Sequence, residues 1–531
     1  MKKILLFILA LTIAFSVMSC NSMREYAIKD PLLSANQPDD LYRVYYEIFV
    51  ASFSDSNKDG FGDLRGLINR FDYLNDSDDN SGKSLGIEGI WLMPIMPSPS
   101  YHKYDVSDYK NIDSRYGSLE DFEDLMQIAN ERNVSIIIDL VINHTSNQHP
   151  WFKQALKAFQ EGDLENKYLD YYVLVTEEEK ESGKAYYPFY GEYFYEGNFS
   201  PSMPELDLDN LDVRDEIIEI VEFWYDLGVT GFRLDAAKYP YLHEDSKNIE
   251  FWNWFVSECK KIKEDTYIVG EVWSGDSLIA PYYESFSNFD FGMSQLQGAV
   301  ATVAKQYDDV NWYVSYLNTY RSMIEQISPN AILTPFITNH DMNRAAGFLS
   351  VADYEMQVAA NLYILSYGNP FIYYGEEIGM KGSRTTENTD ANRRLAMLWG
   401  DNDTVSDPVG TTYDKKNQDN GTVKSQLRDK ESLLNHYKKL IMIRKANPEI
   451  ARGYYTPIVF AGWYNFGGFL STYEDSTVGV FHNTGEIEII IDLSVYINFN
   501  FESISAYIGY GKAELSGQTL KISPFTSVVL K

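Results

Sequence analysis

Short apolar runs alternate with amphipathic stretches along the chain from about residue 43 to residue 447. The apolar runs are continuous in hydrophobicity, which is typical of strands buried on both faces of a parallel sheet. They read YRVYYEIFV, GIEGIWLMP, VSIIIDLVI, VTGFRLD, TYIVGEVW, AILTPFITNHD and PFIYYGEEIG. Because such strands alternate with helical stretches, we predict the α/β class and a TIM (β/α)8 barrel.

The stretches between these runs carry helix signals at their ends. Ser118 and Asp121 form a capping box before a helix with one apolar face. The segment 212–228 places its apolar residues along one stripe and ends at Gly228. A third predicted helix lies in the segment 432–448 and stops at a proline. The connections between the predicted strands are therefore helical, as a barrel requires.

The spacing departs from a plain barrel in two places. About 85 residues rich in Tyr, Glu and Gly separate the third strand from the fourth, so we predict an inserted irregular subdomain after strand 3. Beyond Arg452, alternating strands with Gly and Asn turns indicate a C-terminal antiparallel β domain. The predicted layout is a signal peptide at 1–19, a tether at 20–40, the barrel at 41–141 and 208–451, the inserted subdomain at 142–207, and the C-terminal domain at 452–531.

The N-terminus predicts export. Two lysines precede the apolar run ILLFILALTIAFSV and then MSC, which is the layout of a signal peptide. The cysteine resembles that of a bacterial lipobox, so we expect Cys20 to be the lipidated first residue of a membrane-anchored lipoprotein at the cell surface or in the periplasm. A plain cleaved signal with an incidental cysteine is the alternative. Cys259 then has no partner, and no disulfide framework is implied.

Charge and composition narrow the choice of partners. The chain has 45 basic and 77 acidic residues and a formal net charge of -32, which disfavours nucleic acid and an anionic membrane surface as partners. Apart from the N-terminal run, no segment reaches the roughly 18 apolar residues of a membrane span. The aromatic content of 15 % fits ordinary packing as well as rings on which sugars stack.

The stretch DSNKDGFGD predicts a calcium loop. Asp55, Asn57, Asp59, the carbonyl of Phe61, and Asp63 offer oxygen atoms at alternate positions around a glycine. It is not an EF-hand, because the twelfth position is a glycine and a strand precedes the loop. A solvated turn is the alternative, since Asp, Asn and Gly form turns readily.

Carboxylates follow several of the predicted strands. In a barrel, Asp235, Glu271 and Asp341 would meet at one rim although they lie far apart in sequence. Glycoside cleavage needs such a set, with one carboxyl group to protonate the leaving oxygen and another to attack the anomeric carbon. Arg233 lies two places before Asp235, on the same side of the strand, so it can keep that carboxylate ionised. Glu271 faces two other anions, and we expect its pKa to be raised. A helix cap or structural ion pair is the alternative for any one of these acids.

The sequence resembles the α-amylase family of retaining glycoside hydrolases and transglycosylases. Four motifs carry the resemblance, namely DLVINH, GFRLDAAKY, VGEVW and TNHD. A fifth, MPELD, lies near the end of the predicted insertion. The resemblance covers nearly all of the chain after the signal. It implies Asp235 as nucleophile, Glu271 as acid and base, and Asp341 as the residue that stabilises the distorted sugar.

The resemblance also implies contacts to substrate. His144 and His340 would hydrogen-bond hydroxyl groups of the sugar that is cleaved. In the segment YHKYD, Tyr104 would stack under that sugar with His102 beside it. Lys238 is expected in the leaving-group subsite, and Arg233 is counted among the substrate-binding residues. In TDANRRLAMLW, Asp390 and Arg394 resemble a pair that contacts the next sugar outward, with a surface salt bridge as the alternative.

Several branches of this family carry a calcium loop after strand 1, so the resemblance supports structural Ca²⁺ as the cofactor at the loop described above. A second calcium of many amylases uses an asparagine that corresponds to Asn143 and a backbone carbonyl where this chain has Tyr239 instead of histidine, which puts that ion in doubt.

Two local features resemble enzymes that act on α-1,4 bonds, namely HKY and the Ala236–Lys238 segment after the nucleophile. We therefore predict hydrolysis of starch or maltooligosaccharides by a monomer. A transglycosylase, an exo-acting or 1,6-acting enzyme, and an inactive glycan-binding lipoprotein remain as alternatives.

Overall fold

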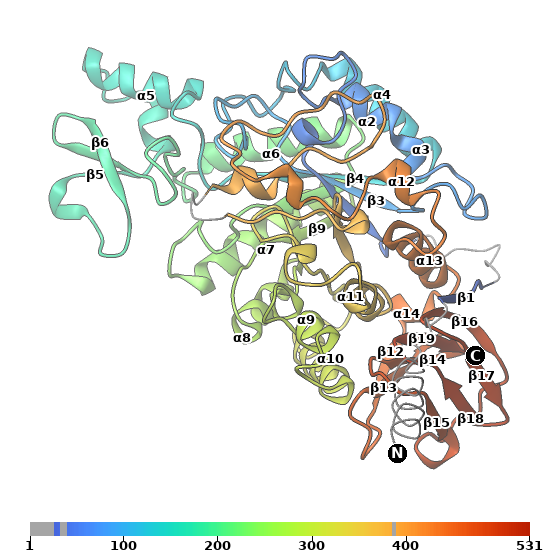
Figure 1. Ribbon diagram of the computed structural model, residues 1–531. Coiled ribbons are helices and arrows are strands. Elements are labelled where there is room, and N and C mark those ends of the chain that lie inside the picture. The colour runs from blue at the N-terminus through green and yellow to red at the C-terminus, as the bar shows by residue number, and fades with distance from the viewer. Residues whose placement is uncertain (1–25, 32–39, 385–388) are drawn as a thin grey trace, which may run out of the picture.

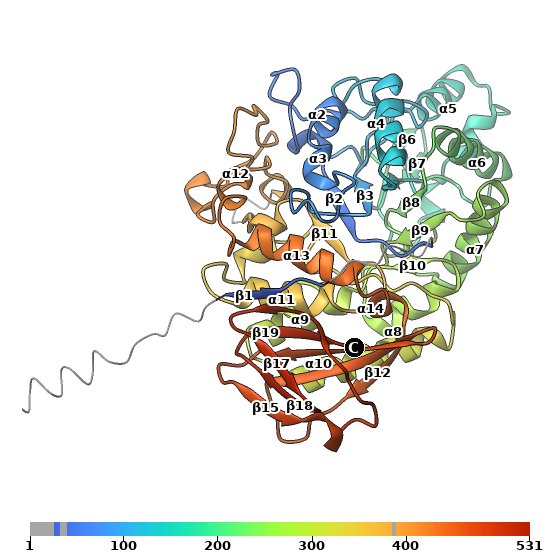
Figure 2. The same ribbon diagram turned by 90° about the vertical axis from the view of Figure 1, so that its right-hand side faces the viewer.

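The computed structural model describes residues 26–31, 40–384 and 389–531. Its centre is a parallel sheet whose strands follow the order β10-β9-β8-β4-β3-β2-β11. The bounds of these strands are β2 Tyr45–Ile48, β3 Gly89–Leu92, β4 Ser135–Leu140, β8 Gly231–Leu234, β9 Tyr267–Gly270, β10 Ser287–Asn288 and β11 Phe371–Tyr373. Parallel bridges from Thr334 to Phe289 and from Phe336 to Phe371 join the two edges. The sheet therefore closes into the predicted barrel, at the centre of Figures 1 and 2.

Two barrel positions differ from the sequence prediction. The run 331–341 was expected to be a full strand, but it contributes only the bridges at Thr334 and Phe336. The position before it is filled by β10, whose two residues, Ser287 and Asn288, carry no apolar signal. Both segments lie where the barrel closes, so a few backbone contacts suffice to complete the ring.

Helices cover the outside of the barrel, as Figure 2 shows. Their bounds are α2 Leu64–Asn69, α3 Phe71–Leu74, α4 Leu119–Glu131, α6 Leu211–Asp226, α7 Asp245–Ile262, α8 Asp276–Ile279, α9 Ala299–Ala304, α10 Val310–Glu325, α11 Glu355–Ile364, α12 Val423–Gln426, α13 Leu433–Lys445 and α14 Glu449–Arg452. The predicted capping box at Ser118 and Asp121 is present at α4. The apolar stripe of α6 is buried, including Val213 and Trp224. No helix in the described part of the chain has both the length and the apolar character needed to cross a membrane.

The inserted subdomain lies between β4 and β8 and projects from the barrel on the left of Figure 1. It holds α5 (Pro150–Glu161) and an antiparallel sheet of β5 (Leu174–Val175), β7 (Tyr193–Glu196) and β6 (Tyr186–Tyr190). A bridge between His144 and Glu205 ties its returning chain to the barrel side. This contact brings the segment Phe199–Met203 over the barrel rim.

The C-terminal β domain has two antiparallel sheets, and the barrel helices α10 and α14 pack against the larger one. Its strands are β12 Tyr454–Ile458, β13 Phe466–Tyr473, β14 Ser476–Asn483, β15 Ile489–Asp492, β16 Ile504–Gly509, β17 Ala513–Ser516, β18 Thr519–Ile522 and β19 Thr526–Leu530. β1 (Ala27–Lys29) pairs with β16 at the edge of the larger sheet. Part of the segment 20–40 is thus a strand of this domain and not a tether. Cys20 and the predicted signal peptide lie outside the described residues.

Candidate active site

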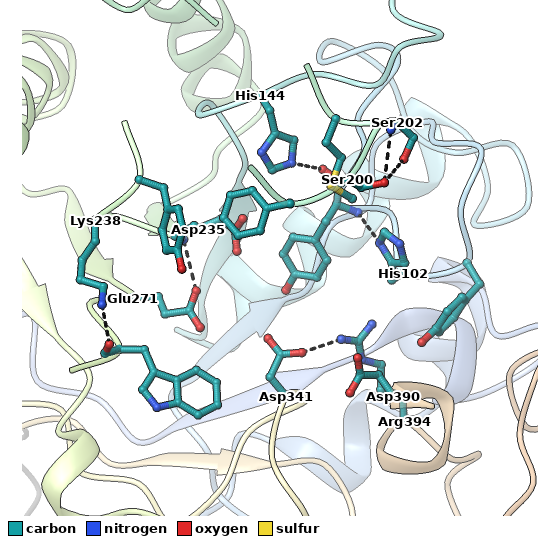
Figure 3. A pocket seen from close by; sticks show the side chains of 17 residues that line it. His102, His144, Ser200, Ser202, Asp235, Lys238, Glu271, Asp341, Asp390 and Arg394 are labelled. Carbon is teal, nitrogen blue, oxygen red and sulfur yellow. Dashed lines mark hydrogen bonds and ion pairs between the residues drawn. The ribbon is translucent and has the colours of Figure 1, made fainter. Parts of the chain in front are cut away.

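The three acids expected at one rim do line one pocket. Asp235 follows β8, Glu271 follows β9, and Asp341 follows the bridging segment at 334–336. The cavity has a volume of about 540 Å³, and Figure 3 shows the three carboxyl groups around its floor. The barrel explains this convergence, because parallel strands present their carboxyl ends at the same rim. The chemical roles of the three acids stay a prediction at this point.

The backbone places Asp235 and Glu271 on neighbouring strands. The Glu271 N–H donates to the Leu234 carbonyl at 3.0 Å. At the start of β8, a Cβ on Gly231 would lie 1.8 Å from the carbonyl oxygen of Tyr267, so only glycine allows the two strands to approach this closely. The glycine of GFRLD is therefore required by strand packing.

Arg233 lies fully buried beneath the pocket and contacts three carboxylates. Its Nη1 is 2.6 Å from Asp235 Oδ1 and 2.9 Å from Asp139 Oδ1, and its Nη2 is 3.0 Å from Glu271 Oε2. Arg233 of β8 is paired with Asp139 of the neighbouring strand β4. A single guanidinium therefore holds the two acids predicted to act on substrate at fixed positions, and its positive charge favours their ionised forms. It was predicted to contact substrate, but it does not line the pocket.

Glu271 is a candidate proton donor. Burial raises its pKa; the charge of Arg233 opposes the rise, and Asp235 and Asp341 add to it. The direction agrees with the sequence prediction, but the main cause is burial and not the neighbouring anions. Glu271 Oε2 also accepts a hydrogen bond of 3.2 Å from the N–H of Ala236, which has a φ of 47°. This left-handed turn after the nucleophile candidate aims an N–H group at the acid candidate.

Asp341 belongs to a charged chain that reaches into the barrel. His340 Nε2 lies 3.1 Å from Asp341 Oδ2, and His340 Nδ1 donates to Glu47 Oε1 at 2.5 Å. Burial acts against a charged imidazole, but Asp341 and Glu47 raise the pKa of His340 to about 9. On the other side, Arg394 Nη2 donates to Asp341 Oδ1 at 2.7 Å. Although burial alone would raise it, His340 and Arg394 hold the pKa of Asp341 well below its usual value.

Two residues predicted to touch the sugar lie on the pocket wall, while a third lies behind it. Tyr104 lines the pocket, and its ring stacks on His340 with centroids 5.6 Å apart. The Tyr104 hydroxyl is 2.7 Å from His340 Nε2 and donates to Asp139 Oδ2 at 3.0 Å. His144 also lines the pocket. His340 is fully buried, and both its ring nitrogens contact protein groups. It therefore supports Tyr104 and Asp341 and does not line the pocket, so it is not placed for the predicted contact with the sugar.

The histidines on the wall are held neutral by their surroundings. Burial lowers the pKa of His102 to about 4, and Arg394 adds to the effect. Burial likewise lowers the pKa of His144, whose Nε2 lies 3.1 Å from the Tyr104 carbonyl. A neutral imidazole can both donate and accept, which suits contacts to hydroxyl groups.

The three outer residues that were predicted to contact sugar all line the pocket. Lys238 lines the pocket, and its Nζ donates to the Trp273 carbonyl at 2.8 Å. Asp390 and Arg394 both line the pocket but do not pair with one another. Asp390 binds Arg384 and Arg393, whereas Arg394 binds Asp341. The alternative of a salt bridge between the two residues is therefore wrong, and Arg394 instead contacts the active-site acid Asp341 (Figure 3).

Sequence reasoning missed several residues of the site. Glu47 is 1 % exposed on β2, and a carboxylate in the middle of the strand-like run YRVYYEIFV could have marked it. The remaining missed side chains give the pocket aromatic and hydroxyl walls; they are Tyr101, Phe199, Ser200, Ser202, Met203, Tyr239 and Trp273. Tyr101, Met203, Tyr239 and Trp273 lie inside the motifs YHKYD, MPELD, GFRLDAAKY and VGEVW, which could have marked them. Only the fold brings the segment 199–202 to the rim, so no local pattern identifies the other three.

The predicted calcium loop forms a compact turn. Asp55 accepts backbone hydrogen bonds from Lys58 and Gly60, and Asn57 Oδ1 accepts one from the Asp59 N–H. Asp63 instead caps α2 through Gly66. Across residues 26–31, 40–384 and 389–531, no three His, Cys, Asp or Glu side chains gather in a way that could hold a metal ion. The loop supplies the oxygen chemistry of a calcium site, but Asp63 would have to exchange its helix-capping bonds to join one.

Asn143, the residue that would correspond to a ligand of the second calcium, contacts a protein carboxylate. The side-chain amide of Asn143 donates to Glu205, which is buried. Lys184 Nζ lies 3.4 Å from Glu196 Oε2 in the same junction between subdomain and barrel. A lysine therefore supplies positive charge at this junction.

The chain matches the family model described as "Alpha amylase, catalytic domain" over residues 47–453. The chain belongs to the α-amylase family. It is 37 % identical over 499 residues to alpha-amylase 3 of Dictyoglomus thermophilum, a match that covers 93 % of this chain and 94 % of that protein. It is 32 % identical over 430 residues to a 4-alpha-glucanotransferase of Thermotoga maritima, covering 77 % of this chain and 88 % of that protein. Among solved structures, Amy13B of Eubacterium rectale superimposes with a TM-score of 0.86 at 36 % identity, covering 94 % of this chain and 97 % of the other.

The relatives named above include an amylase and a glucanotransferase. Membership of the family therefore does not decide whether water or a sugar hydroxyl group accepts the glucosyl unit. The match confirms that the chain is an enzyme of this family with a barrel and a C-terminal β domain.

Proposed function

We propose that this protein is a retaining glycoside hydrolase that cleaves α-1,4-glucosidic bonds of starch or maltooligosaccharides. One observation carries the proposal: Asp235 and Glu271 contact two nitrogens of the same buried guanidinium, at 2.6 Å and 3.0 Å, and both line the pocket. Double displacement needs a nucleophilic carboxylate and an acid close together, and the adjacent strands β8 and β9 provide this.

The two acids divide the reaction. In the first step, an Asp235 oxygen attacks the anomeric carbon while Glu271 gives its proton to the departing glycosidic oxygen. In the second step, Glu271 takes a proton from water, whose oxygen attacks the same carbon and releases Asp235. The raised pKa of Glu271 keeps the proton available for the first step.

The other groups hold the sugar and stabilise its charge. Asp341, ionised between His340 and Arg394, faces the pocket and stabilises the positively charged sugar of the transition state. Tyr104 forms the stacking wall, and His102 and His144 contact hydroxyl groups. Lys238 and Trp273 border the leaving-group side. We assign Asp390 to an outer sugar.

The acceptor separates hydrolysis from transfer. The chain is similar to a glucanotransferase as well as to an amylase, so a second candidate is a 4-α-glucanotransferase that uses a sugar hydroxyl in place of water. We favour water, because the similarity to the amylase is higher and covers more of the chain than the similarity to the glucanotransferase. The local HKY and Ala236–Lys238 features, which resemble enzymes that act on α-1,4 bonds, weigh against 1,6-bond cleavage.

Two product measurements on soluble starch and maltoheptaose test the proposal. Proton NMR during the first minutes should show α-anomeric reducing ends, whereas β-anomeric product contradicts retention. Chromatographic sizing of the reaction with maltoheptaose alone should show only products shorter than this substrate. Longer products would assign the transferase, and cleavage of isomaltose in preference to maltose would assign 1,6-specificity. The absence of any turnover would favour the alternative of an inactive glycan-binding protein.

We also propose a structural calcium ion at the loop from Asp55 to Asp63. Its support is the alternation of oxygen-bearing residues and the buried Asp55, whose pKa is lowered by hydrogen bonds from Thr404 and Gly60 despite its burial. Calcium should raise the melting temperature and a chelator should lower it, because an ion that binds only the folded state stabilises it. An unchanged melting temperature with both reagents contradicts the site.

Finally, we propose that the protein is exported, carries lipid at Cys20 and acts as a monomer. The support for lipidation is the signal-like N-terminus. Radiolabelled palmitate should enter the full chain and not the Cys20→Ala variant. Equal labelling of both would contradict lipidation at this residue. Light scattering of the protein without its signal peptide and Cys20 should give a mass near that of one chain. The mass of a dimer would contradict the monomer.

A further inference from the structure

A second cavity of about 520 Å³ opens on the same rim of the barrel as the active site. It is built by the loops that follow β10, the 334–336 segment and β11, together with the loop around Tyr413. Its volume falls within the usual range of small-molecule sites. Nothing in the proposed mechanism uses it.

The side chains that line this cavity are polar but almost uncharged. Gln295, Gln297 and Asn417 bring amide groups, Tyr413 brings a hydroxyl, and Phe348 brings a half-buried ring. Within the described part of the chain, the side chains of Gln295, Gln297 and Asn417 hydrogen-bond no protein group. Amides that can both donate and accept, beside a ring face, match the hydroxyl groups and apolar faces of neutral sugars.

The charges of the cavity largely cancel. Lys381 Nζ donates to Asp419 Oδ1 at 2.6 Å, so that pair is neutral as a whole. Lys416 is the remaining cation on the lining and is exposed. A single exposed lysine is a weak anchor for an anion, because solvent screens it and no second cation converges with it.

The cavity is held in shape by bonds that do not involve a ligand. Gln418 donates to the Lys381 carbonyl at 2.6 Å and accepts from the Lys381 N–H at 2.9 Å. Gln295 has a φ of 65°, a left-handed conformation that is costly for a residue other than glycine. Its N–H donates to the Ile337 carbonyl at 2.9 Å, which fixes that turn. The structure thus maintains a strained glutamine at the edge of an open polar cavity.

One layer of side chains connects the cavity to the active site. Asn343 lines the cavity, and its Oδ1 accepts from Arg393 Nε at 3.2 Å. Arg393 Nη1 in turn donates to the Asp341 carbonyl at 2.5 Å and to Asp390 Oδ1 at 2.9 Å. The cavity therefore lies directly behind the wall that carries an active-site acid.

We propose that this cavity binds glucosyl units of an α-glucan outside the active site. The inference rests on the proposed α-glucan substrate. It adds a second point of contact on the same rim, which raises the local concentration of polysaccharide at the active site.

The double variant Gln295→Ala/Gln297→Ala tests the proposal, with Gln127→Ala on α4 as the matched control. For an aryl maltoside, which fills the active site alone, kcat and KM should stay unchanged in the double variant. For soluble starch, KM should rise roughly 3- to 30-fold with kcat unchanged, as expected for the loss of one or two hydrogen bonds. The control variant should match the wild type on both substrates.

Three ligands separate the sources of the glucan. If the cavity holds the far part of a chain already in the active site, the rise in KM should appear with maltoheptaose and not with maltotriose. If it holds a separate chain, β-cyclodextrin should bind the wild type without competing with the aryl maltoside, and the double variant should lose that binding.

An unchanged KM for starch together with unchanged cyclodextrin binding overturns the proposal. Inorganic phosphate that binds the wild type but not Lys416→Met would assign the cavity to anions instead. Activity of the wild type on the aryl maltoside is measured on the same preparation, so failure of the proposed function is seen separately as a lack of turnover.

Discussion

Two groups of buried acids in this barrel look alike in sequence but differ in their partners. Asp235 and Glu271 follow β8 and β9, contact Arg233 and line the pocket. Glu376 and Glu377 follow β11, but tyrosine hydroxyls surround them and neither lines the pocket. Glu376 Oε1 accepts from Tyr363 and Tyr437 at 2.7 Å and 2.8 Å, and Glu377 Oε1 accepts from Tyr46 and Tyr73 at 2.8 Å and 2.5 Å.

The difference teaches what marks a reactive carboxylate. A charged partner on one side and an open cavity on the other leave an acid ready to exchange protons or attack a substrate. In a closed site, neutral hydroxyl partners hold one oxygen of each acid, and the acid has no access to substrate. A strand-end position alone does not distinguish the two groups.

The largest effect is expected from Asp235→Asn. It should lower kcat/KM on maltoheptaose by at least roughly 10³-fold, because a covalent step loses its nucleophile. Binding of maltoheptaose, measured by calorimetry, should persist. Glu376→Gln is the matched control among buried acids and should keep nearly full activity. Residual activity above a tenth of wild type in Asp235→Asn would remove Asp235 from the mechanism.

Glu271→Gln should give a loss that depends on the leaving group. With maltoheptaose the rate should fall about 10²- to 10⁴-fold, since general acid catalysis is lost. With a maltosyl fluoride, whose leaving group needs no proton, the first step should be much less affected. Equal losses on both substrates would show that Glu271 does not act as the acid.

Glu47→Gln tests the supporting chain behind Asp341. Removing the Glu47 charge should lower the pKa of His340 from about 9, because that charge favours the imidazolium. The imidazole of His340, followed by NMR, should then titrate at lower pH than in the wild type. The kcat on maltoheptaose should fall, because a neutral His340 supports the ionised Asp341 less well. An unchanged titration of His340 contradicts a positioning role for Glu47.

The smallest effect is expected on stability, at the tyrosine-bound group. Burial raises the pKa of Glu376 from 4.5 to about 7, while its two tyrosine partners oppose the rise. The folded state therefore holds its proton more tightly than the unfolded state. The resulting stabilisation is present below pH 4.5 and is lost as the pH rises to about 7.

Glu376→Gln keeps an Oε1 that can accept from both tyrosines but cannot ionise. The difference in melting temperature, variant minus wild type, should be larger at pH 8 than at pH 5 by roughly a few degrees. Activity should not follow the same pattern. An identical difference at both pH values would contradict the raised pKa.

The comparison also shows what sequence can and cannot predict. Asp235, Glu271 and Asp341 were predictable together, because each acid follows an apolar run and the carboxyl ends of parallel strands lie at the same rim of a barrel. The barrel and the C-terminal domain were predictable from the change in hydrophobic period. β10 was not, since two polar residues carry no periodic signal.

Pairings between distant segments were the main failure. Asp390 and Arg394 were predicted to contact an outer sugar, but no sequence pattern indicated that their side chains would bind Arg384 and Asp341. Glu47 and His340 are 293 positions apart and meet only because β2 lies next to β11 and near the 334–336 segment. The pairing of β1 with β16 has the same origin, since the edge of a folded domain recruits a short segment without a pattern of its own.

The most direct test of the account is to identify the residue that becomes attached to sugar. A fluorinated α-glucosyl fluoride that slows the second step should label the protein once, and mass spectrometry of the digest should place the label on the peptide with Asp235. The Asp235→Asn variant should take up none. A label on Glu271 or Asp341, or no covalent label while the reagent is still turned over, would contradict the proposed mechanism.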